Sequence, residues 1–135
     1  MSLLRSLHVG ATALVAQAKR LNVVASNMAN AESVTGPDGK PYRARQVYFQ
    51  TVPMAGEAAA GVEVAKVIED PSPLRKVHRP GHPNADANGF VELPNVNPVE
   101  EMVNMISAAR SYQMNIEAMT TSRQLLLKTL DLGRG

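Results

Sequence analysis

The chain has 135 residues, which suits one ordinary domain, and its 14 basic and 12 acidic residues leave a net charge of only +2. This balance argues against nucleic acid as the main partner and against a surface built for anionic membranes. The chain contains no cysteine, which excludes a disulfide scaffold, a cysteine nucleophile and thiolate metal sites. No apolar run reaches the roughly 18 residues of a membrane span, so direct membrane insertion is not expected.

Residues 1–31 carry the pattern of a helix that packs against other helices. Apolar residues recur every seven positions, and small alanines interleave with large leucines at the second position of each heptad. A stripe kept over four heptads favours coiled-coil packing. The predicted seam consists of Leu4, Leu7, Ala11, Leu14, Ala18, Leu21, Ala25 and Met28.

The same segment has an alternative interpretation as a signal peptide. Arg5 precedes the short apolar stretch LHVGATALVAQA, which ends in a possible A-x-A cleavage site at Ala16–Ala18. Cleavage there would leave Lys19 first and would turn the chain into a small secreted ligand- or metal-binding domain. Because the helical pattern continues through the supposed site, we expect an intact N-terminal helix.

Residues 32–96 form a proline-rich middle region. All nine prolines of the chain lie between Pro37 and Pro98, and GPDGKPY is dense in turn-forming residues. The segments ARQVYFQTV and GVEVAKVIED alternate as strands do, and PMAGEAAAG between them predicts a flexible hairpin connection. The following segment PSPLRKVHRPGHPNADANGFVELPN has too many prolines for a central strand, so we expect it to run extended over another surface.

Residues 97–135 predict a second long helix. Asn97 is a favoured N-cap residue, and Pro98 is favoured at the first position of a helix. Glu100 stands three residues after Asn97, where a capping box has its acidic residue. Spacings of three and four residues then define a second apolar stripe. Its predicted members are Met102, Met105, Ala109, Tyr112, Ile116, Met119, Leu126 and Leu130.

The sequence offers no convincing catalytic, metal or cofactor site. His78, His82 and Asp86 have the four-residue spacing of helical metal ligands, but Pro80 and Pro83 forbid that helix. Glu100 and Glu101 are adjacent and point in different directions on a helix, so they do not form a catalytic pair. With no nucleophile elbow and no phosphate-binding glycine loop, we expect no enzyme activity and no small-molecule substrate.

These features predict an elongated α+β fold, in which the two terminal helices form a coiled coil and the middle region supplies a β-hairpin and extended segments. Pairing two helices covers one stripe on each, and apolar surface left over marks an interaction site. Head-to-tail association that does not close produces a helical filament. The residues alone therefore indicate a self-assembling or co-assembling structural protein. An amphipathic membrane-surface protein is the other alternative, although it leaves the stripe of the second helix unexplained.

The end of the first helix carries a recognisable motif. The stretch ASNMANAES resembles the S-N-[IL]-A-N signature of bacterial flagellar rod and hook proteins, formed here by Ser26, Asn27, Met28, Ala29 and Asn30, with Met in place of Leu or Ile. The segments GPDGKPYRARQVYFQ, VEVAKVIEDPSPLRKVHRPGHPNAD and GFVELPNVNPVEEMVNMISAARSYQMN extend the resemblance to the small proximal-rod members over nearly the whole chain. His78 stands where the family pattern leads us to expect tyrosine, which is a polar exchange in a loop.

The resemblance implies a structural subunit of the proximal rod in the flagellar basal body. Its terminal helices would form a coiled coil facing the rod centre, and the β-rich middle would contact adjacent subunits outside. Partners would be further copies of the chain, other rod proteins and the flagellar type III export apparatus, which exports such chains without a cleaved signal peptide. The assembly would lie in the periplasmic span, transmit motor torque and enclose the export channel for motility. No cofactor is implied.

The two asparagines of the motif also have a physical interpretation. Their amides can satisfy exposed backbone carbonyls of their own helix or of a neighbouring helix, which would set helix register without charge. We expect Asn30 to do this, while simple helix capping is an equally good account of either asparagine.

Overall fold

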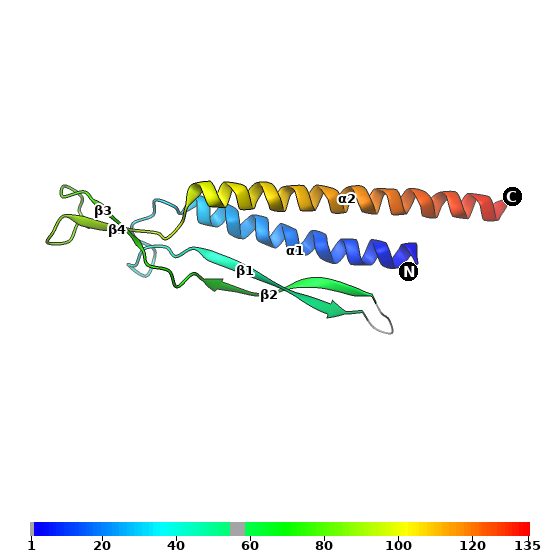
Figure 1. The fold of residues 1–135 in the computed structure, drawn as a ribbon, viewed down its shortest axis with the longest axis horizontal. Helices are drawn as coiled ribbons and strands as arrows, with labels where there is room; N and C mark the ends of the chain where they lie inside the picture. Colours follow the sequence, from blue (N-terminus) through cyan, green and yellow to red (C-terminus); the bar gives the residue numbers. More distant parts are fainter. Residues whose placement is uncertain (1, 55–58) are drawn as a thin grey trace.

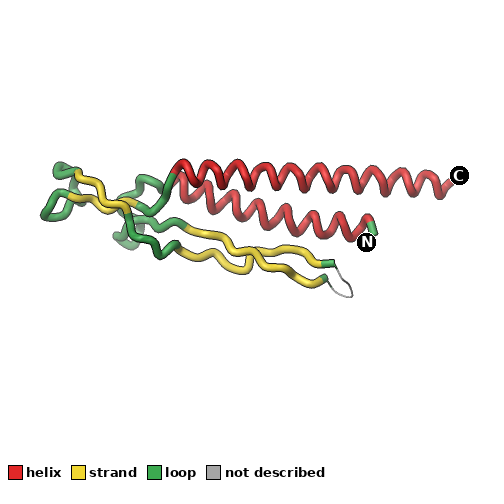
Figure 2. The backbone as a smooth tube through the Cα atoms, viewed as in Figure 1, coloured by secondary structure: helices red, strands yellow, loops and turns green. Residues whose placement is uncertain are grey.

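The computed structural model describes residues 2–54 and 59–135, which form an elongated α+β structure (Figures 1 and 2). The elements in chain order are α1 (Leu3–Ala29), β1 (Arg45–Pro53), β2 (Ala60–Glu69), β3 (Arg75–His78), β4 (Phe90–Leu93) and α2 (Pro98–Arg134). The prediction of two long terminal helices enclosing a β-containing middle region is confirmed.

The two helices lie side by side and antiparallel. Helix α1 begins after Ser2, whose hydroxyl accepts a hydrogen bond from the Arg5 amide, and it ends at Asn30. Helix α2 begins as predicted, because the Asn97 side chain accepts from the amides of Val99 and Glu100 at 3.1 and 3.4 Å. The helices approach closely at Gly10, where an added Cβ would lie 2.7 Å from Met119 Cγ.

Helix α2 is ten residues longer than α1, with 37 residues against 27. Its C-terminal part therefore extends past the start of α1 at one end of the molecule (Figure 1). No helix among residues 2–54 and 59–135 is long and apolar enough to cross a membrane.

Strands β1 and β2 form the predicted antiparallel hairpin, from Arg45 opposite Glu69 to Pro53 opposite Ala60. The register shifts between Tyr48 and Phe49, as in a β-bulge, which increases the local twist. The predicted flexible connection includes residues 55–58, which lie outside the described part of the chain.

The expectation that the segment after residue 70 runs extended over another surface is wrong. Strands β3 and β4 pair antiparallel, from Arg75 opposite Leu93 to His78 opposite Phe90. The prolines do not prevent this second hairpin, because Pro73 and Pro80 flank the four-residue strand β3 and do not interrupt it. Among the described helices and strands, β3 and β4 contact only each other.

A small core includes residues of β4 and of the segment that leads from β4 to α2. Val91 and Leu93 on β4, and Val96 after it, are almost fully buried. Val96 also clusters with Ala31 and Ala44, and the Tyr42 ring packs against this cluster. The largest buried side chains are thus aliphatic, in keeping with the scarcity of aromatic residues.

Helix α1 is the middle layer of the long part of the molecule. It contacts α2 on one side and both β1 and β2 on the other, whereas α2 does not contact these strands (Figure 1). The contact with β2 is close at Thr12, whose Oγ1 accepts from the Val62 amide at 3.1 Å. Gly61 makes this approach possible, since a Cβ there would lie 2.9 Å from the same Oγ1 atom.

Candidate assembly surface

Asn27 joins the end of α1 to the beginning of β1. Its side chain is only 1% exposed and bonds to both backbone groups of Arg45: Oδ1 accepts from the Arg45 amide and Nδ2 donates to the Arg45 carbonyl, each at 2.9 Å. The Tyr42 hydroxyl also donates to Asn27 Oδ1 at 2.8 Å. An amide side chain carries both donors and acceptors, so Asn27 pairs with Arg45 in the manner of a neighbouring strand.

The other polar residues of the motif, Ser26 and Asn30, make hydrogen bonds at the C-terminal end of α1. Asn30 Nδ2 donates to the Ser26 carbonyl at 2.9 Å, and Asn30 Oδ1 accepts from the Ser33 hydroxyl at 3.2 Å. The expected contact of Asn30 with a carbonyl of its own helix is therefore present. The Ser26 hydroxyl lies 3.3 Å from that of Tyr42. Met28 is half-buried and Ala29 is exposed.

A second set of hydrogen bonds ties the two hairpins together. Asn95 accepts from the Ala44 amide at 2.8 Å and donates to the carbonyls of Asp70 and Ser72 at 3.0 Å. Arg43 donates to the same two carbonyls at 3.2 and 3.0 Å. These side chains hydrogen-bond to backbone groups that have no partner on a neighbouring strand. They therefore fix the position of the proline-containing turn after β2.

Arg75 fastens the second hairpin to the end of α1. Its guanidinium group donates to the carbonyls of Pro94 and Ala31, each at 3.2 Å, and lies 3.4 Å from the Glu32 carboxylate. We call the contacts made by Asn27, Arg43, Arg75 and Asn95 the junction. It connects the helix pair to both hairpins.

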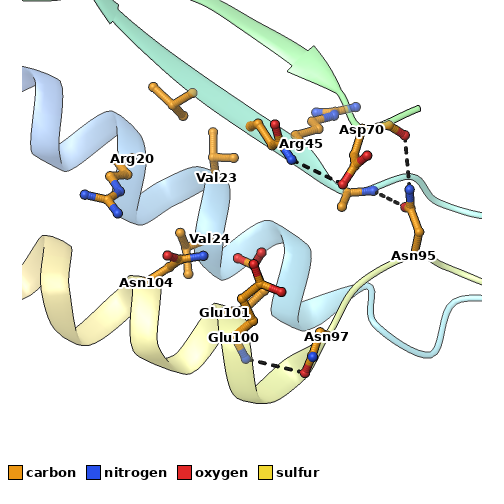
Figure 3. Close-up of a pocket in the computed structure, with 13 residues that line it drawn as sticks. Arg20, Val23, Val24, Arg45, Asp70, Asn95, Asn97, Glu100, Glu101 and Asn104 are labelled. Carbon is orange, nitrogen blue, oxygen red and sulfur yellow. Dashed lines mark hydrogen bonds between the residues drawn. The ribbon is translucent and has the colours of Figure 1, made fainter. Parts of the chain in front are cut away.

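A polar cavity of about 300 Å³ adjoins the junction, between α1, β1 and the start of α2 (Figure 3). Burial raises the pKa of Glu101, and Glu100 adds to this effect, while Asn27 and Arg20 act in the opposite direction. One carboxylate oxygen of Glu101 is inaccessible to solvent and has no hydrogen-bond partner. Hydrogen bonds from Ser72 lower the pKa of Asp70.

The residues of the predicted seam on α1 differ in burial. Leu4 and Ala25 are exposed, and the other six members are half-buried. The fully buried residues of α1 are Ala16, Val24 and Asn27, which the heptad analysis leaves outside the seam. Helix α1 contacts both α2 and the first hairpin, so it buries residues on more than one side.

The residues of the predicted stripe on α2 are also covered unequally. Met105, Ala109, Tyr112, Met119 and Leu126 are half-buried, and Met102, Ile116 and Leu130 are exposed. Further large apolar side chains of α2 are exposed outside this stripe, namely Val99, Val103, Ile106, Met114, Leu125, Leu127 and Leu132. Exposed apolar surface on this scale is typical of a protein that is buried in an assembly.

The three residues with the four-residue spacing of metal ligands have structural contacts. His78 packs edge-on against the Phe90 ring, with ring centres 5.1 Å apart. His82 Nδ1 accepts from the Asn84 amide, and Asp86 accepts from the amides of Asn88 and Phe90. In the described part of the chain, no group of three His, Asp or Glu side chains could hold a metal ion.

The strand partner of Asn27 was not predicted. The motif predicts that Asn27 caps its own helix or contacts carbonyls of its own or a neighbouring helix, whereas its observed partner Arg45 lies on β1, 18 positions along the chain. Val23 and Val24, which precede the motif, could have indicated this contact. They make a second side of α1 apolar, and this predicts that a further element packs against the helix.

Two family descriptions match the chain. The one described as flagella basal body rod protein matches residues 7–37, which include the motif at the end of α1. The one described as flagellar basal body rod FlgEFG protein C-terminal matches residues 87–132, which include most of α2.

Curated relatives match over their full length. The flagellar basal-body rod proteins FlgC of Yersinia enterocolitica and Salmonella typhimurium are each 58% identical over 134 residues, covering 99% of this chain and 100% of the relative. FlgC of Bacillus subtilis is 38% identical over 151 aligned residues, with the same coverage. The chain therefore belongs to the FlgC family of flagellar basal-body rod proteins.

Proposed function

We propose that this chain is a structural subunit of the flagellar rod, and that it assembles with other basal-body rod proteins. The observation that carries the proposal is the full-length identity of 58% to relatives named as basal-body rod proteins. The exposed apolar side chains along α2 support it, because a subunit that works alone has no use for them. The function is mechanical: torque passes along the rod, and catalysis plays no part.

The inner layer of the rod is formed by residues 1–31 and 97–135, and residues 32–96 lie outside. In this arrangement the seam residues of α1 and the stripe of α2 pack as a coiled coil against neighbouring subunits, around the export channel. The half-burial of Leu7, Leu14 and Leu21 within one chain supports this, since each still has surface to bury. Burial contributes about 25 cal/mol per Å² of apolar surface, so many small contacts add up to a stiff shaft.

The chain reaches the periplasmic span through the flagellar type III export apparatus, without cleavage of a signal peptide. Helix α1 runs unbroken through Ala16–Ala18, and Ala16 is buried. Cleavage after Ala18 would remove Thr12 and Gly10, and with them the hydrogen bond of Thr12 to β2 and the close approach of Gly10 to Met119 on α2. An intact N-terminus is therefore part of the proposal.

Imaging of basal bodies tests the proposal. A strain that lacks the gene for this chain is compared with the same strain carrying it on a plasmid, by electron microscopy of detergent-extracted basal bodies and by motility in soft agar. Rods and motility are expected only with the plasmid. Complete rods in the deletion strain would overturn the proposal.

A further inference from the structure

The turn that joins β3 to β4 contains the one Asn-Gly pair of the chain, formed by Asn88 and Gly89. Asparagine is among the chemically labile residues of proteins, because the next backbone nitrogen can attack its side-chain amide. A following glycine has no side chain to hinder that attack, and it lets the backbone turn freely. Asn88 is exposed, so water reaches its side chain. The pair is therefore a candidate site of chemical modification.

The second hairpin requires glycine at position 89. The φ angle of Gly89 is 82°, in the left-handed region that residues with a Cβ rarely adopt. A Cβ at this position would also lie 3.0 Å from His78 Nε2 and 3.2 Å from Pro80 Cβ. A larger residue, which would slow the attack on Asn88, is thus disfavoured by the geometry of the hairpin. The labile pair is a consequence of this fold.

Hydrogen bonds hold the peptide group between the two residues. The Gly89 amide donates to the Asp86 carbonyl at 3.0 Å, and the Gly89 carbonyl accepts from the Arg79 amide at 2.8 Å. Asp86 Oδ1 accepts from the amides of Asn88 and Phe90, each at 2.9 Å. Gly89 is also buried. The attacking nitrogen has to lose its proton and turn toward the Asn88 side chain, so the reaction requires these bonds to open.

We propose that Asn88 is a deamidation site, which the folded turn closes and which opening of the second hairpin makes reactive. The Gly89 nitrogen attacks Cγ of Asn88, the bond from Cγ to the side-chain nitrogen breaks, and ammonia leaves with the proton of the Gly89 amide. Water then opens the cyclic imide at either carbonyl, which leaves aspartate or isoaspartate at position 88. Water is the only co-reactant, and the site does not depend on the proposed function.

The second hairpin is suited to local opening. Its strands have four residues each, and within the part of the chain that the structure describes neither strand contacts another helix or strand than its partner. A two-stranded hairpin is marginally stable alone, and local unfolding costs less free energy than global unfolding. The reacted turn does not close as before, because a new carboxylate lies close to Asp86 and isoaspartate lengthens the backbone. Deamidation therefore loosens the turn permanently.

Peptide mass spectrometry of the purified full-length chain tests the site, because deamidation in heavy-oxygen water raises the mass of the peptide that contains Asn88. The chain is incubated at mildly alkaline pH with and without urea, and the rate in urea measures the unprotected reaction. Deamidation of Asn88 is expected in both conditions. Its rate should be lower by about tenfold or more without urea, because only the open turn reacts.

Variants of Asp86 test the role of the turn. Asp86→Ala removes the acceptor of two hydrogen bonds, so the rate without urea should rise by about tenfold and the rate in urea should stay unchanged. Asp86→Asn keeps an acceptor oxygen and should react like the natural chain. Asp38→Ala is the matched control, because Asp38 accepts from the Lys40 amide in the other turn that contains a positive-φ glycine. It should leave the rate at Asn88 unchanged.

Equal rates with and without urea in the natural chain would overturn the protection by the turn. No reaction at Asn88 in urea would overturn the site itself. Both comparisons use the natural chain, so they hold even if a variant fails to fold. A slow rate in an Asp86→Ala chain that retains the circular dichroism of the natural chain would also contradict closure of the site by the turn bonds.

Discussion

Asn27 and Arg45 are joined as two residues of adjacent strands would be, although Asn27 belongs to a helix. Both backbone groups of Arg45 bond to the one side-chain amide at 2.9 Å. The bonds anchor the open edge of β1 where it begins, while Thr12 anchors β2 near the other end of the hairpin. A two-stranded hairpin is marginally stable by itself, so these two anchors explain how it keeps its place on α1.

The first prediction concerns the two asparagines of the motif. Asn27→Ala removes three hydrogen bonds and leaves buried partners unsatisfied, so the free energy of unfolding should fall by about 2–3 kcal/mol. Asn30→Ala is the matched control and should cost about 1 kcal/mol. Urea unfolding of the purified chain, followed by circular dichroism, measures both. Equal losses would show that Asn27 is a capping residue only.

The second prediction concerns the approach of α1 to β2. Gly61→Ala should destabilise the chain, because the new Cβ would lie 2.9 Å from Thr12 Oγ1 and 3.1 Å from Cγ2. Thr12→Ala alone should also destabilise it, through the lost bond to Val62. In the double variant the clash is gone, so its loss should be smaller than the sum of the single losses. If the losses of stability in the two single variants simply add in the double variant, Gly61 and Thr12 are not in contact, and the hairpin lies farther from α1 than described.

The third prediction concerns pH. Because burial raises the pKa of Glu101, the folded chain binds this proton more tightly than the unfolded chain. Stability should therefore decrease as pH rises from the usual glutamate pKa through the raised one, and the penalty should be complete above it. Glu101→Gln should stabilise the chain at neutral pH, by an amount that vanishes in acid.

Glu100→Gln is the matched control for this effect, since Glu100 is the exposed neighbour on the first turn of α2. Unfolding curves at several pH values should show no comparable gain for it. A gain from Glu101→Gln that is independent of pH would exclude titration of Glu101 as its cause.

The fourth prediction concerns the end of α2 in the free chain. Because Gly10 lies beside Met119 and antiparallel helices rise equally per residue, α2 passes the start of α1 at about residue 126. A short helical end without contacts is marginal in water. Hydrogen exchange in a dilute monomer should be fast over residues 127–134 and slow around Leu93 and Val96, which are buried. Full protection of the helix end in dilute monomer would contradict its dependence on neighbours.

The fifth prediction concerns the seam. Leu14→Asp combined with Leu21→Asp should abolish rod assembly and leave secretion of the chain intact, because charge cannot be buried without a partner. Asn22→Asp adds charge at an exposed position of the same helix and should leave motility unchanged. Motility assays and immunoblots of secreted protein provide the readout, and a motile double variant would refute a buried seam.

The terminal helices and the first hairpin could be predicted because local patterns determine them. Asn97 and Pro98 mark one helix start, and the strands alternate on either side of a turn-rich connection. The second hairpin escaped prediction because its strands have four residues each, and prolines surround them. Local pattern cannot show that Asn95 and Arg75 hold this segment through partners at least 19 positions away.

The seam shows a different limit. A heptad pattern identifies residues that prefer burial, but it does not say which neighbour buries them. Within one chain α1 buries Ala16, Val24 and Asn27, and it leaves Leu4 exposed. The remaining surface is available to other subunits, which the sequence of one chain cannot specify.

Methionine oxidation tests most directly whether the exposed helix surface is the assembly surface. Met102 and Met114 are 52 and 66% exposed in the single chain, whereas Met105 and Met119 are half-buried. Limited peroxide treatment, followed by mass spectrometry, compares the dilute chain with extracted rods. Met102 and Met114 should be oxidised readily in the dilute chain and protected in rods, and equal oxidation of both in the two states would contradict the account.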